Sequence, residues 1–222
     1  MPRSHSPLPA TDPPLDTLNL SPALAALVRR AVPRRYRKGV ILIQEGEFGD
    51  TLYVVLSGRV KVFSLGPNDR EITFGLYGVG EFVGEMSLDG GPRAASVVTV
   101  EPTTCVVISR PTLLDHIALH PEFAFELLSK VIARARTATR DARNMALMDS
   151  YGRLVALIET LAVEQADGTR SIAHRVTHAE IASRIGCSRE MVSRLLKDLE
   201  RGGYTATIGR GLHILKPLPT RW

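Results

Sequence analysis

The sequence predicts an α+β protein, in which a domain of short strands precedes one long helix and a small domain of paired helices. Three observations predict this class. Short apolar runs bounded by Gly, Asn, Asp or Pro fill residues 36–110, which is typical of a barrel or sandwich. Residues 122–147 contain neither Gly nor Pro, which indicates a single helix. Beyond residue 150, two short amphipathic segments flank a glycine-containing turn, which indicates a helix-turn-helix.

Length and charge favour two domains with different partners. A chain of 222 residues is long enough to bury two cores. Residues 130–222 hold 16 Lys and Arg against 9 Asp and Glu, whereas residues 1–129 hold 12 against 14. The basic C-terminal part favours contact with a polyanion, although an ordinary solvated basic surface has the same charge.

Composition also excludes several classes. No apolar run approaches the ~20 residues that a membrane span needs, so no membrane partner is expected. The first 20 residues are rich in Pro and lack the apolar core of a signal peptide, which predicts a flexible tail on a cytoplasmic protein. Cys105 and Cys187 are too few for a disulfide framework or a four-thiolate metal site.

The N-terminal part begins with a helix and continues as strands. Leu24, Leu27 and Val28 recur at helical spacing within residues 22–31. Glycines then stand where the chain should reverse direction between apolar runs. The predicted strands are residues 40–43, 51–56, 59–63, 72–76, 95–100 and 104–108.

The long helix follows a shorter helical tract that starts at Pro111 and is interrupted at Pro121. Residues 122–147 would extend ~39 Å at 1.5 Å per residue. Apolar residues within it follow the 3-4 spacing of a coiled-coil seam, which favours a parallel homodimer over packing against the chain's own strands. The seam residues are Leu128, Val131, Ala135, Ala138, Ala142 and Met145.

The C-terminal part starts near Asp149, where a helix start signal and a hinge are expected. A helix over residues 151–164 and a strand over residues 172–176 should follow. Thr177 and Glu180 have capping-box spacing and would open the next helix, which stops at Gly186.

A second helix should start at Ser188 and end near residue 200. Strands over residues 205–208 and 212–215 then form a hairpin, so the unit is a winged helix-turn-helix. N-terminal residues of a recognition helix reach base edges in the major groove. Arg189 and Arg194 can bond guanine, and Glu190 can accept from cytosine, although a solvated charged face is the simpler alternative.

Residues 81–97 combine an acid, an arginine and several small residues between two apolar runs. An arginine such as Arg93 fits phosphate oxygens with paired N–H donors, and glycine lets a ligand approach the main chain. Glu85 would repel a phosphate and should instead accept from a ribose hydroxyl. A surface turn in which Glu85 pairs with Arg93 is the alternative.

The order of these residues resembles the phosphate-binding cassette of the cyclic-nucleotide-binding domain, F-x-G-E-x-[AS]-L followed by R-x-A-[ST]-V. This resemblance implies a β-roll (double-stranded β-helix, jelly-roll-like). It also implies that Arg93 neutralises the cyclic phosphate and Glu85 takes the ribose 2′-hydroxyl, while Gly84, Met86, Ser87 and Ala94 complete the cradle. The matching positions are Phe82, Gly84, Glu85, Ser87, Leu88, Arg93, Ala95, Ser96 and Val97.

Residues 186–194, G-C-S-R-E-M-V-S-R, resemble the recognition helix of the Crp/Fnr transcription regulators, in the catabolite-activator (cyclic AMP receptor protein) branch. The resemblance implies base contacts to TGTGA half-sites and phosphate contacts around them. The implied base-reading residues are Arg189, Glu190 and Arg194, the implied phosphate contacts are Thr177, His178 and Ser188, and Ser193 lies on the same outer face.

Together the resemblances imply a homodimeric regulator that binds double-stranded DNA, is gated by a cyclic nucleotide and works with RNA polymerase. Cyclic AMP is the expected ligand, with cyclic di-GMP as the alternative. Relatives contact adenine through a Thr-Ser pair on the long helix, where this chain has Ala138 and Thr139, so Thr139 joins the candidate ligand-binding residues. The expected domains are a tail over 1–20, a cyclic-nucleotide-binding β-roll over 21–121, a dimerisation helix over 122–148 and the winged helix-turn-helix over 149–222.

Two other classes of protein are considered: a redox or gas sensor of the same architecture, with an iron–sulfur cluster or a haem, and an enzyme. An iron–sulfur sensor needs a cysteine cluster that the N-terminal segment lacks. An enzyme is not expected, because there is no Ser/His/Asp arrangement, metal motif or Walker loop. A haem-type gas or redox sensor stays open, since its ligands could come from His5, His116, His120, His174, His178 or His213.

Overall fold

The computed structural model describes residues 18–165, 169–172, 176–209 and 211–219, and it divides into two compact units. The N-terminal unit comprises residues 1–64 and 74–133, and the C-terminal unit comprises residues 65–73 and 134–222. Each unit has its own apolar core. Most of the predicted tail lies outside the described residues, and at its end Leu18 and Leu20 pack against the N-terminal core.

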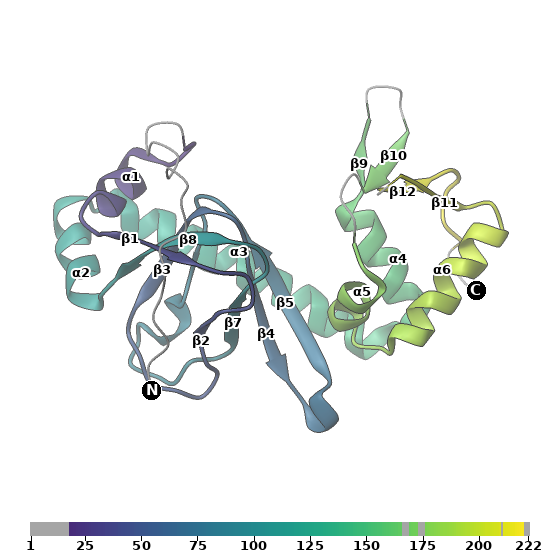
Figure 1. Cartoon of the computed structure of the whole chain (residues 1–222), viewed down its shortest axis with the longest axis horizontal. Helices are drawn as coiled ribbons and strands as arrows, with labels where there is room; N and C mark the ends of the chain where they lie inside the picture. Colours follow the sequence, from purple (N-terminus) through teal and green to yellow (C-terminus); the bar gives the residue numbers. More distant parts are fainter. Residues whose placement is uncertain (1–17, 166–168, 173–175, 210, 220–222) are drawn as a thin grey trace. The chain divides into compact units, whose positions relative to one another are not determined.

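The N-terminal unit contains two four-stranded sheets with orders β1-β8-β3-β6 and β2-β7-β4-β5 (Figure 1). Their paired strands run antiparallel. The first sheet consists of β1 Pro33–Tyr36, β8 Thr103–Ile108, β3 Leu52–Ser57 and β6 Phe82–Val83. The second consists of β2 Ile41–Ile43, β7 Ser96–Thr99, β4 Val60–Leu65 and β5 Glu71–Tyr77. The α+β class and the six predicted strands are confirmed.

Sequence reasoning missed β1 and β6 for identifiable reasons. The β1 segment carries Pro33 and two arginines, and it pairs only with β8 at the edge of its sheet. Edge strands tolerate proline and charge. Strand β6 has two residues, too few to show alternation, and its pairing with β3 defines it.

Alternation along the central strand β3 places its side chains in two cores. Leu52, Val54 and Leu56 face a layer of helices, while Val55 lies between the two sheets. The helices are α1 Pro22–Val28, α2 Arg110–Leu119 and the start of α3 Glu122–Leu147. Two short 3₁₀ helices, η2 Pro67–Asp69 and η3 Glu85–Ser87, complete the connections.

Helix α3 has the predicted 26 residues, and Phe123 is its buried anchor. Several large apolar side chains along it are exposed in the single chain, including Phe125 at 73%, Leu128 at 52% and Val131 at 36%. Leu128 and Val131 belong to the predicted seam. The homodimer through α3 stays a prediction, and the exposed seam is the surface that it would cover.

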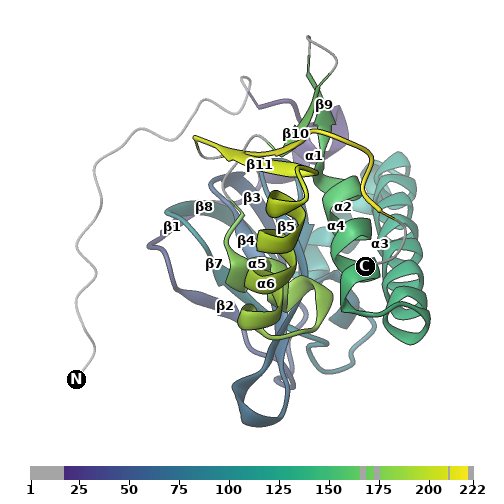
Figure 2. The same cartoon turned by 90° about the vertical axis from the view of Figure 1, so that its right-hand side faces the viewer.

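The C-terminal unit contains α4 Ser150–Leu161, α5 His178–Ile185 and α6 Arg189–Arg201, with a sheet of order β11-β12-β10-β9 (Figures 1 and 2). Its strands are β9 Val163–Glu164, β10 Arg170–Ile172, β11 Thr205–Ile208 and β12 Gly211–Ile214. The strand predicted over 172–176 shares only Ile172 with β10; Val176 lies outside any strand, and residues 173–175 lie outside the described part.

Amphipathic spacing builds the core of this unit. Leu154 and Ile158 of α4 pack with Ile181 of α5 and with Val192 and Leu199 of α6. Asp149 caps α4 by accepting a hydrogen bond from the Gly152 amide at 2.7 Å, as the predicted start signal requires. In the described segments, no helix has the length and apolar character needed to cross a membrane.

Candidate phosphate cradle and nucleic-acid interface

The cradle starts where the chain leaves β6. Gly84 has φ +96°, a left-handed conformation that residues other than glycine rarely adopt. A Cβ atom there would lie 2.6 Å from the Thr51 carbonyl oxygen and 2.9 Å from Nη1 of Arg93. Gly84 therefore permits both the turn into η3 and the close approach of Arg93, and a side chain at this position would break the arrangement.

Arg93 is buried, with 7% of its surface exposed, and its guanidinium is held by two separate segments of the chain. Nη1 donates to the carbonyl oxygens of Thr51 and Gly84, both at 3.0 Å, and to Oγ of Ser87 at 2.6 Å. Nη2 donates to Oγ1 of Thr51 at 2.8 Å. The backbone of Arg93 is fixed as well, because its amide donates to the Glu47 carbonyl and its carbonyl accepts from the Gly46 amide.

Electrostatics favour an anion at this arginine. Burial lowers the pKa of Arg93, while coulombic interaction with Tyr53, Asp50 and Glu85 raises it to a lesser extent. The guanidinium stays charged at neutral pH because arginine titrates far above it. A cation with reduced hydration attracts a phosphate more strongly than a solvated one, since the local dielectric is lower.

The other predicted cradle residues surround this arginine. Glu85 is half-buried in η3, and its charge acts on Arg93. Ser87 is buried and uses its hydroxyl on Arg93, so its side chain helps to build the cradle as well as its backbone. Met86 and Ala94 are exposed, with Met86 at 66%. These roles toward a ligand stay predictions.

Sequence reasoning missed Thr51 and Gly49. Thr51 contributes both a carbonyl and a hydroxyl to Arg93, although it lies 42 residues earlier in the chain. A Cβ at Gly49 would lie 3.0 Å from Nη2 of Arg93. A threonine before a strand and a glycine in a turn are common, so no local signal marks either residue. Only the folded chain brings them to the arginine.

Thr139, the candidate base contact, lies on α3 within the C-terminal unit. It is exposed, and its hydroxyl donates to the Ala135 carbonyl one turn earlier at 2.9 Å. Serine and threonine commonly make this bond in helices. A ligand contact by Thr139 would exchange that hydrogen bond for one to the base, and it stays a prediction.

Both helices of the predicted helix-turn-helix are capped as expected. Thr177 Oγ1 accepts from the Glu180 amide at 3.1 Å, and Ser188 Oγ accepts from the Met191 amide at 3.2 Å. Among the described residues, the Glu180 carboxylate accepts no hydrogen bond from the Thr177 amide, so the capping box is half formed. Gly186 ends α5 with φ +64°, which is typical of a helix C-terminus.

The predicted DNA contacts lie on the outer surfaces of these helices. Arg189, Glu190 and Arg194 of α6 are exposed, as is the cap Ser188, whereas Ser193 is half-buried. At the start of α5, Thr177 and His178 are exposed too. The structure therefore brings all seven predicted residues to two capped helix starts that pack together.

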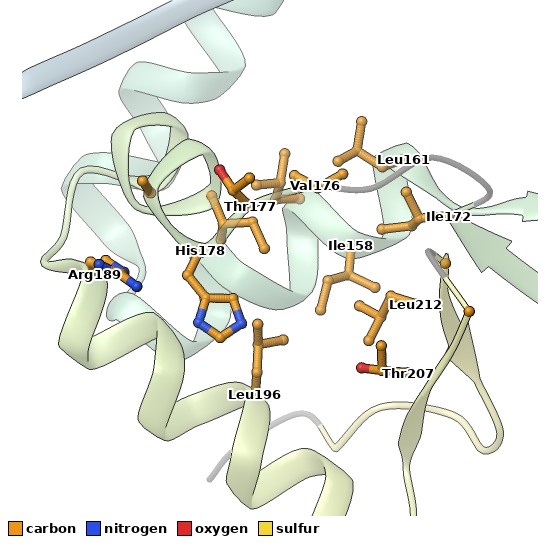
Figure 3. Close-up of a pocket in the computed structure, with 15 residues that line it drawn as sticks. Ile158, Leu161, Ile172, Val176, Thr177, His178, Arg189, Leu196, Thr207 and Leu212 are labelled. Atoms are coloured by element: carbon orange, nitrogen blue, oxygen red, sulfur yellow. The ribbon is translucent and has the colours of Figure 1, made fainter.

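A groove of about 660 Å³ separates these helix starts from the hairpin β11–β12. Figure 3 shows His178 and Arg189 at one end of the groove and Thr207 and Leu212 at the other. Apolar side chains such as Ile158 and Leu196 form its floor. The predicted wing thus lies across the groove from the residues expected to contact DNA.

The described histidines named as candidate ligands lie in different surroundings. Within the described ranges, no cluster of three or more His, Cys, Asp or Glu residues is arranged to hold a metal ion. His116 is fully buried beside His120 and Phe123. His5 and His174 lie outside the described residues.

Two family descriptions match the sequence. Residues 33–120 match the cyclic nucleotide-binding domain, and residues 152–217 match the Crp-like helix-turn-helix domain. Together they cover more than half of the chain. The first range contains the cradle around Arg93, and the second contains α5 and α6.

Similar proteins span nearly the same length. The chain is 32% identical over 196 residues to the CRP-like cAMP-activated global transcriptional regulator of Mycobacterium tuberculosis, covering 86% of this chain and 88% of the relative. It is 32% identical over 189 residues to the CRP-like protein Clp of Xanthomonas axonopodis, covering 80% and 81%.

Solved structures show the same architecture. The c-di-GMP responsive global regulator CLP of Xanthomonas campestris aligns with a TM-score of 0.74 and 28% identity, over 88% of this chain and 99% of that chain. A CooA mutant from Carboxydothermus hydrogenoformans aligns with a TM-score of 0.75 and 19% identity, over 91% and 89%. The second likeness concerns the fold alone.

Proposed function

This chain belongs to the Crp family of cyclic-nucleotide-binding transcription regulators, and we propose that it binds DNA as a homodimer under the control of cyclic AMP. The buried guanidinium of Arg93 carries this proposal. Its pose is fixed by Thr51, Gly84 and Ser87, so a phosphate meets an arginine that is already oriented. Preorganised donors lose little entropy on binding and are therefore effective.

The choice of cyclic AMP rests on a physical argument and on a relative. The cradle supplies one buried cation, which matches the single negative charge of a cyclic mononucleotide phosphate. The relative from Mycobacterium tuberculosis is named as cAMP-activated. Cyclic di-GMP is the second candidate, because the similar regulator of Xanthomonas campestris responds to it. Its second phosphate needs another cationic contact outside this cradle.

The DNA site follows from the second unit. Arg189, Glu190 and Arg194 would read TGTGA half-sites, with Thr177, His178, Ser188 and Ser193 around them on the outer surface. Two copies joined along α3 would place two recognition helices ~34 Å apart, one turn of DNA, on a palindrome. The apolar seam that is exposed in the single chain supports this assembly.

The remaining expectations complete the proposal. The ligand acts by binding one arrangement of the hinge near Asp149 more tightly than the other. RNA polymerase is the expected protein partner, the cytoplasm is the expected location, and no catalysis is assigned to either site. If the chain converted cyclic nucleotide to product during an incubation of several hours, the expectation that it is not an enzyme would be contradicted.

Calorimetric titration tests the ligand assignment directly. Cyclic AMP, cyclic GMP and cyclic di-GMP are titrated in turn into the full chain and into an Arg93→Ala variant. Cyclic AMP should bind the unmodified chain at one site per protomer, and the variant should lose this binding while light scattering still reports a dimer. Equal binding by both proteins would reject the cradle. A visible absorption band in the purified protein would favour a haem sensor instead.

A further inference from the structure

A hydrogen bond links the first turn of α5 to the recognition helix α6. Nδ1 of His178 lies 2.7 Å from Oγ of Ser193, a distance typical of a strong bond. His178 follows the N-cap Thr177 directly, and Ser193 lies one turn into α6. The bond therefore joins two residues that were both assigned to the DNA-facing surface.

The direction of this bond is coupled to the nitrogen that carries the proton in a neutral His178, because the Ser193 hydroxyl can donate to Nδ1 or accept from Nδ1–H. A neutral imidazole has one N–H donor and one acceptor nitrogen. When the Ser193 hydroxyl donates to Nδ1, the proton of His178 is on Nε2. Nε2–H is then a donor on an exposed side chain, which suits a phosphate at the start of a helix.

Protonation of His178 exchanges the donor and the acceptor of the same hydrogen bond. An imidazole gains a second proton between pH 5 and 8, after which both nitrogens donate. Nδ1–H then donates to Ser193 Oγ, and the cation no longer needs serine to direct Nε2. The charged residues of the two helices near this bond in sequence are Glu180 on α5 and Arg189, Glu190, Arg194 and Lys197 on α6. From the wing, the described residues that line this groove are uncharged.

We infer that Ser193 is a positioning residue that acts through His178. When the Ser193 hydroxyl donates to Nδ1, the proton of the neutral imidazole is on Nε2, and neutral His178 becomes a donor to the DNA backbone. This inference rests on the proposed DNA-binding function and adds a pH dependence to it. In the protonated form both ring nitrogens of His178 donate and the cation binds phosphate by itself, so affinity rises and the contribution of Ser193 disappears.

A random-sequence duplex is the appropriate probe, because phosphate contacts do not depend on the operator. Its affinity is measured by fluorescence anisotropy at pH 5.5 and pH 8.0 at one ionic strength. The proteins are the unmodified full chain, Ser193→Ala, His178→Gln, His178→Arg and the double variant His178→Arg/Ser193→Ala. The glutamine variant subtracts the pH effects of other histidines.

The unmodified chain should bind about tenfold more tightly at pH 5.5 than at pH 8.0, since two charge-assisted contacts form per dimer. Ser193→Ala should weaken binding several-fold at pH 8.0 and not at pH 5.5. His178→Arg should remove the part of the pH dependence that comes from His178. Adding Ser193→Ala to His178→Arg should leave the duplex affinity unchanged at both pH values. An equal loss at both pH values, or a loss in the arginine background, would overturn the inference.

Imidazole NMR on the full chain tests the same bond without DNA. At pH 8.0 the ¹⁵N shifts of His178 should report a proton on Nε2, and Ser193→Ala should mix the two tautomers. An unchanged tautomer in Ser193→Ala contradicts the inference whatever the affinities. If the chain binds no duplex at all, the proposed function fails, and the tautomer still decides the role of Ser193.

Discussion

The two sites of this chain hold their arginines in opposite ways. Arg93 is buried, and the hydrogen bonds that its guanidinium donates to segments 42 and 9 residues away fix its position. Arg189 and Arg194 are exposed on one capped helix. A ligand of fixed shape favours a rigid, preorganised arginine, whereas DNA bases are met by side chains that order on contact. Substitutions at the two sites should therefore fail in different ways.

The largest expected effect is at Arg93. Arg93→Ala removes the buried cation and leaves the carbonyls of Thr51 and Gly84 without their donor. Cyclic-nucleotide affinity should fall by more than about a hundredfold. Arg37→Ala, at an exposed arginine of the same unit, is the matched control and should bind normally. Isothermal calorimetry distinguishes the two, and similar losses in both would show that charge alone matters.

The next effect is at Arg189. Arg189→Ala should lose sequence preference by about 1–3 kcal/mol per half-site and retain salt-sensitive binding to random DNA. Arg201→Ala, in the last turn of the same helix, keeps the preference. The measurement is binding-site selection followed by competition between selected and random duplexes. Unchanged selectivity in Arg189→Ala would remove α6 as the base-reading element.

Thr51 gives an intermediate effect within the cradle. Thr51→Val keeps the shape and the carbonyl but removes the hydroxyl that accepts from Nη2 of Arg93. Ligand affinity should fall about tenfold, the low end of the ~1.5–3 kcal/mol that a hydrogen bond to a charged group contributes, because the other bonds still hold Arg93. Thr51→Ser should restore it. A valine variant that binds as tightly as the unmodified chain would show that the hydroxyl has no part in orienting Arg93.

Most elements were predictable because their signals are local. The bounds of α3 and the caps Thr177 and Ser188 depend on neighbours within four residues, and they were found where expected. Thr51, Gly49 and the role of the Ser87 side chain depend on contacts across the fold. Such contacts leave no periodic trace in the sequence. The cassette residues could be named beforehand, but the residues that aim Arg93 could not.

Capping gives a smaller effect, confined to the C-terminal unit. Ser188→Ala should lower its stability by ~1 kcal/mol, because the Met191 amide loses its acceptor. Ser188→Asp keeps the cap while removing the hydroxyl expected to contact phosphate, so it should be stable but bind DNA less tightly. Thermal unfolding followed by circular dichroism, with anisotropy in parallel, separates the two roles. An alanine variant as stable as the unmodified chain would contradict the capping role.

The smallest expected effect is at His116, which is fully buried. In the described part of the chain, its ring nitrogens are the only buried side-chain N or O atoms without a hydrogen-bond partner. Burial is the main cause that lowers the pKa of His116, and the nearby His120 and Arg30 lower it further. The Ala23 backbone and Glu122 raise it by less, so the net shift is downward. The neutral form is therefore the one that the folded state accommodates.

The sign of the pH dependence follows from this shift. As pH falls below the ordinary imidazole value of ~6.5, the unfolded chain takes up a proton that the folded chain does not. Stability is thus fully present above pH 6.5 and declines below it until the folded-state pKa is reached. The unfolding temperature of the unmodified chain should fall by about 2–4 °C between pH 7.5 and pH 5.5. The unfolding temperature of His116→Leu should fall by less over the same pH range. An equal fall in both proteins would show that buried His116 is not the origin of the pH dependence.

The coupling between the two sites is tested most directly by one titration. A fluorescent duplex carrying a TGTGA palindrome is titrated with the full chain in the presence of no ligand, cyclic AMP, cyclic GMP or cyclic di-GMP, and again with Arg93→Ala. One nucleotide, expected to be cyclic AMP, should change the DNA affinity at least tenfold in the unmodified chain and leave it unchanged in the variant. DNA affinity that is the same in all four conditions, or a response that survives Arg93→Ala, would contradict a ligand-gated regulator built on this cradle.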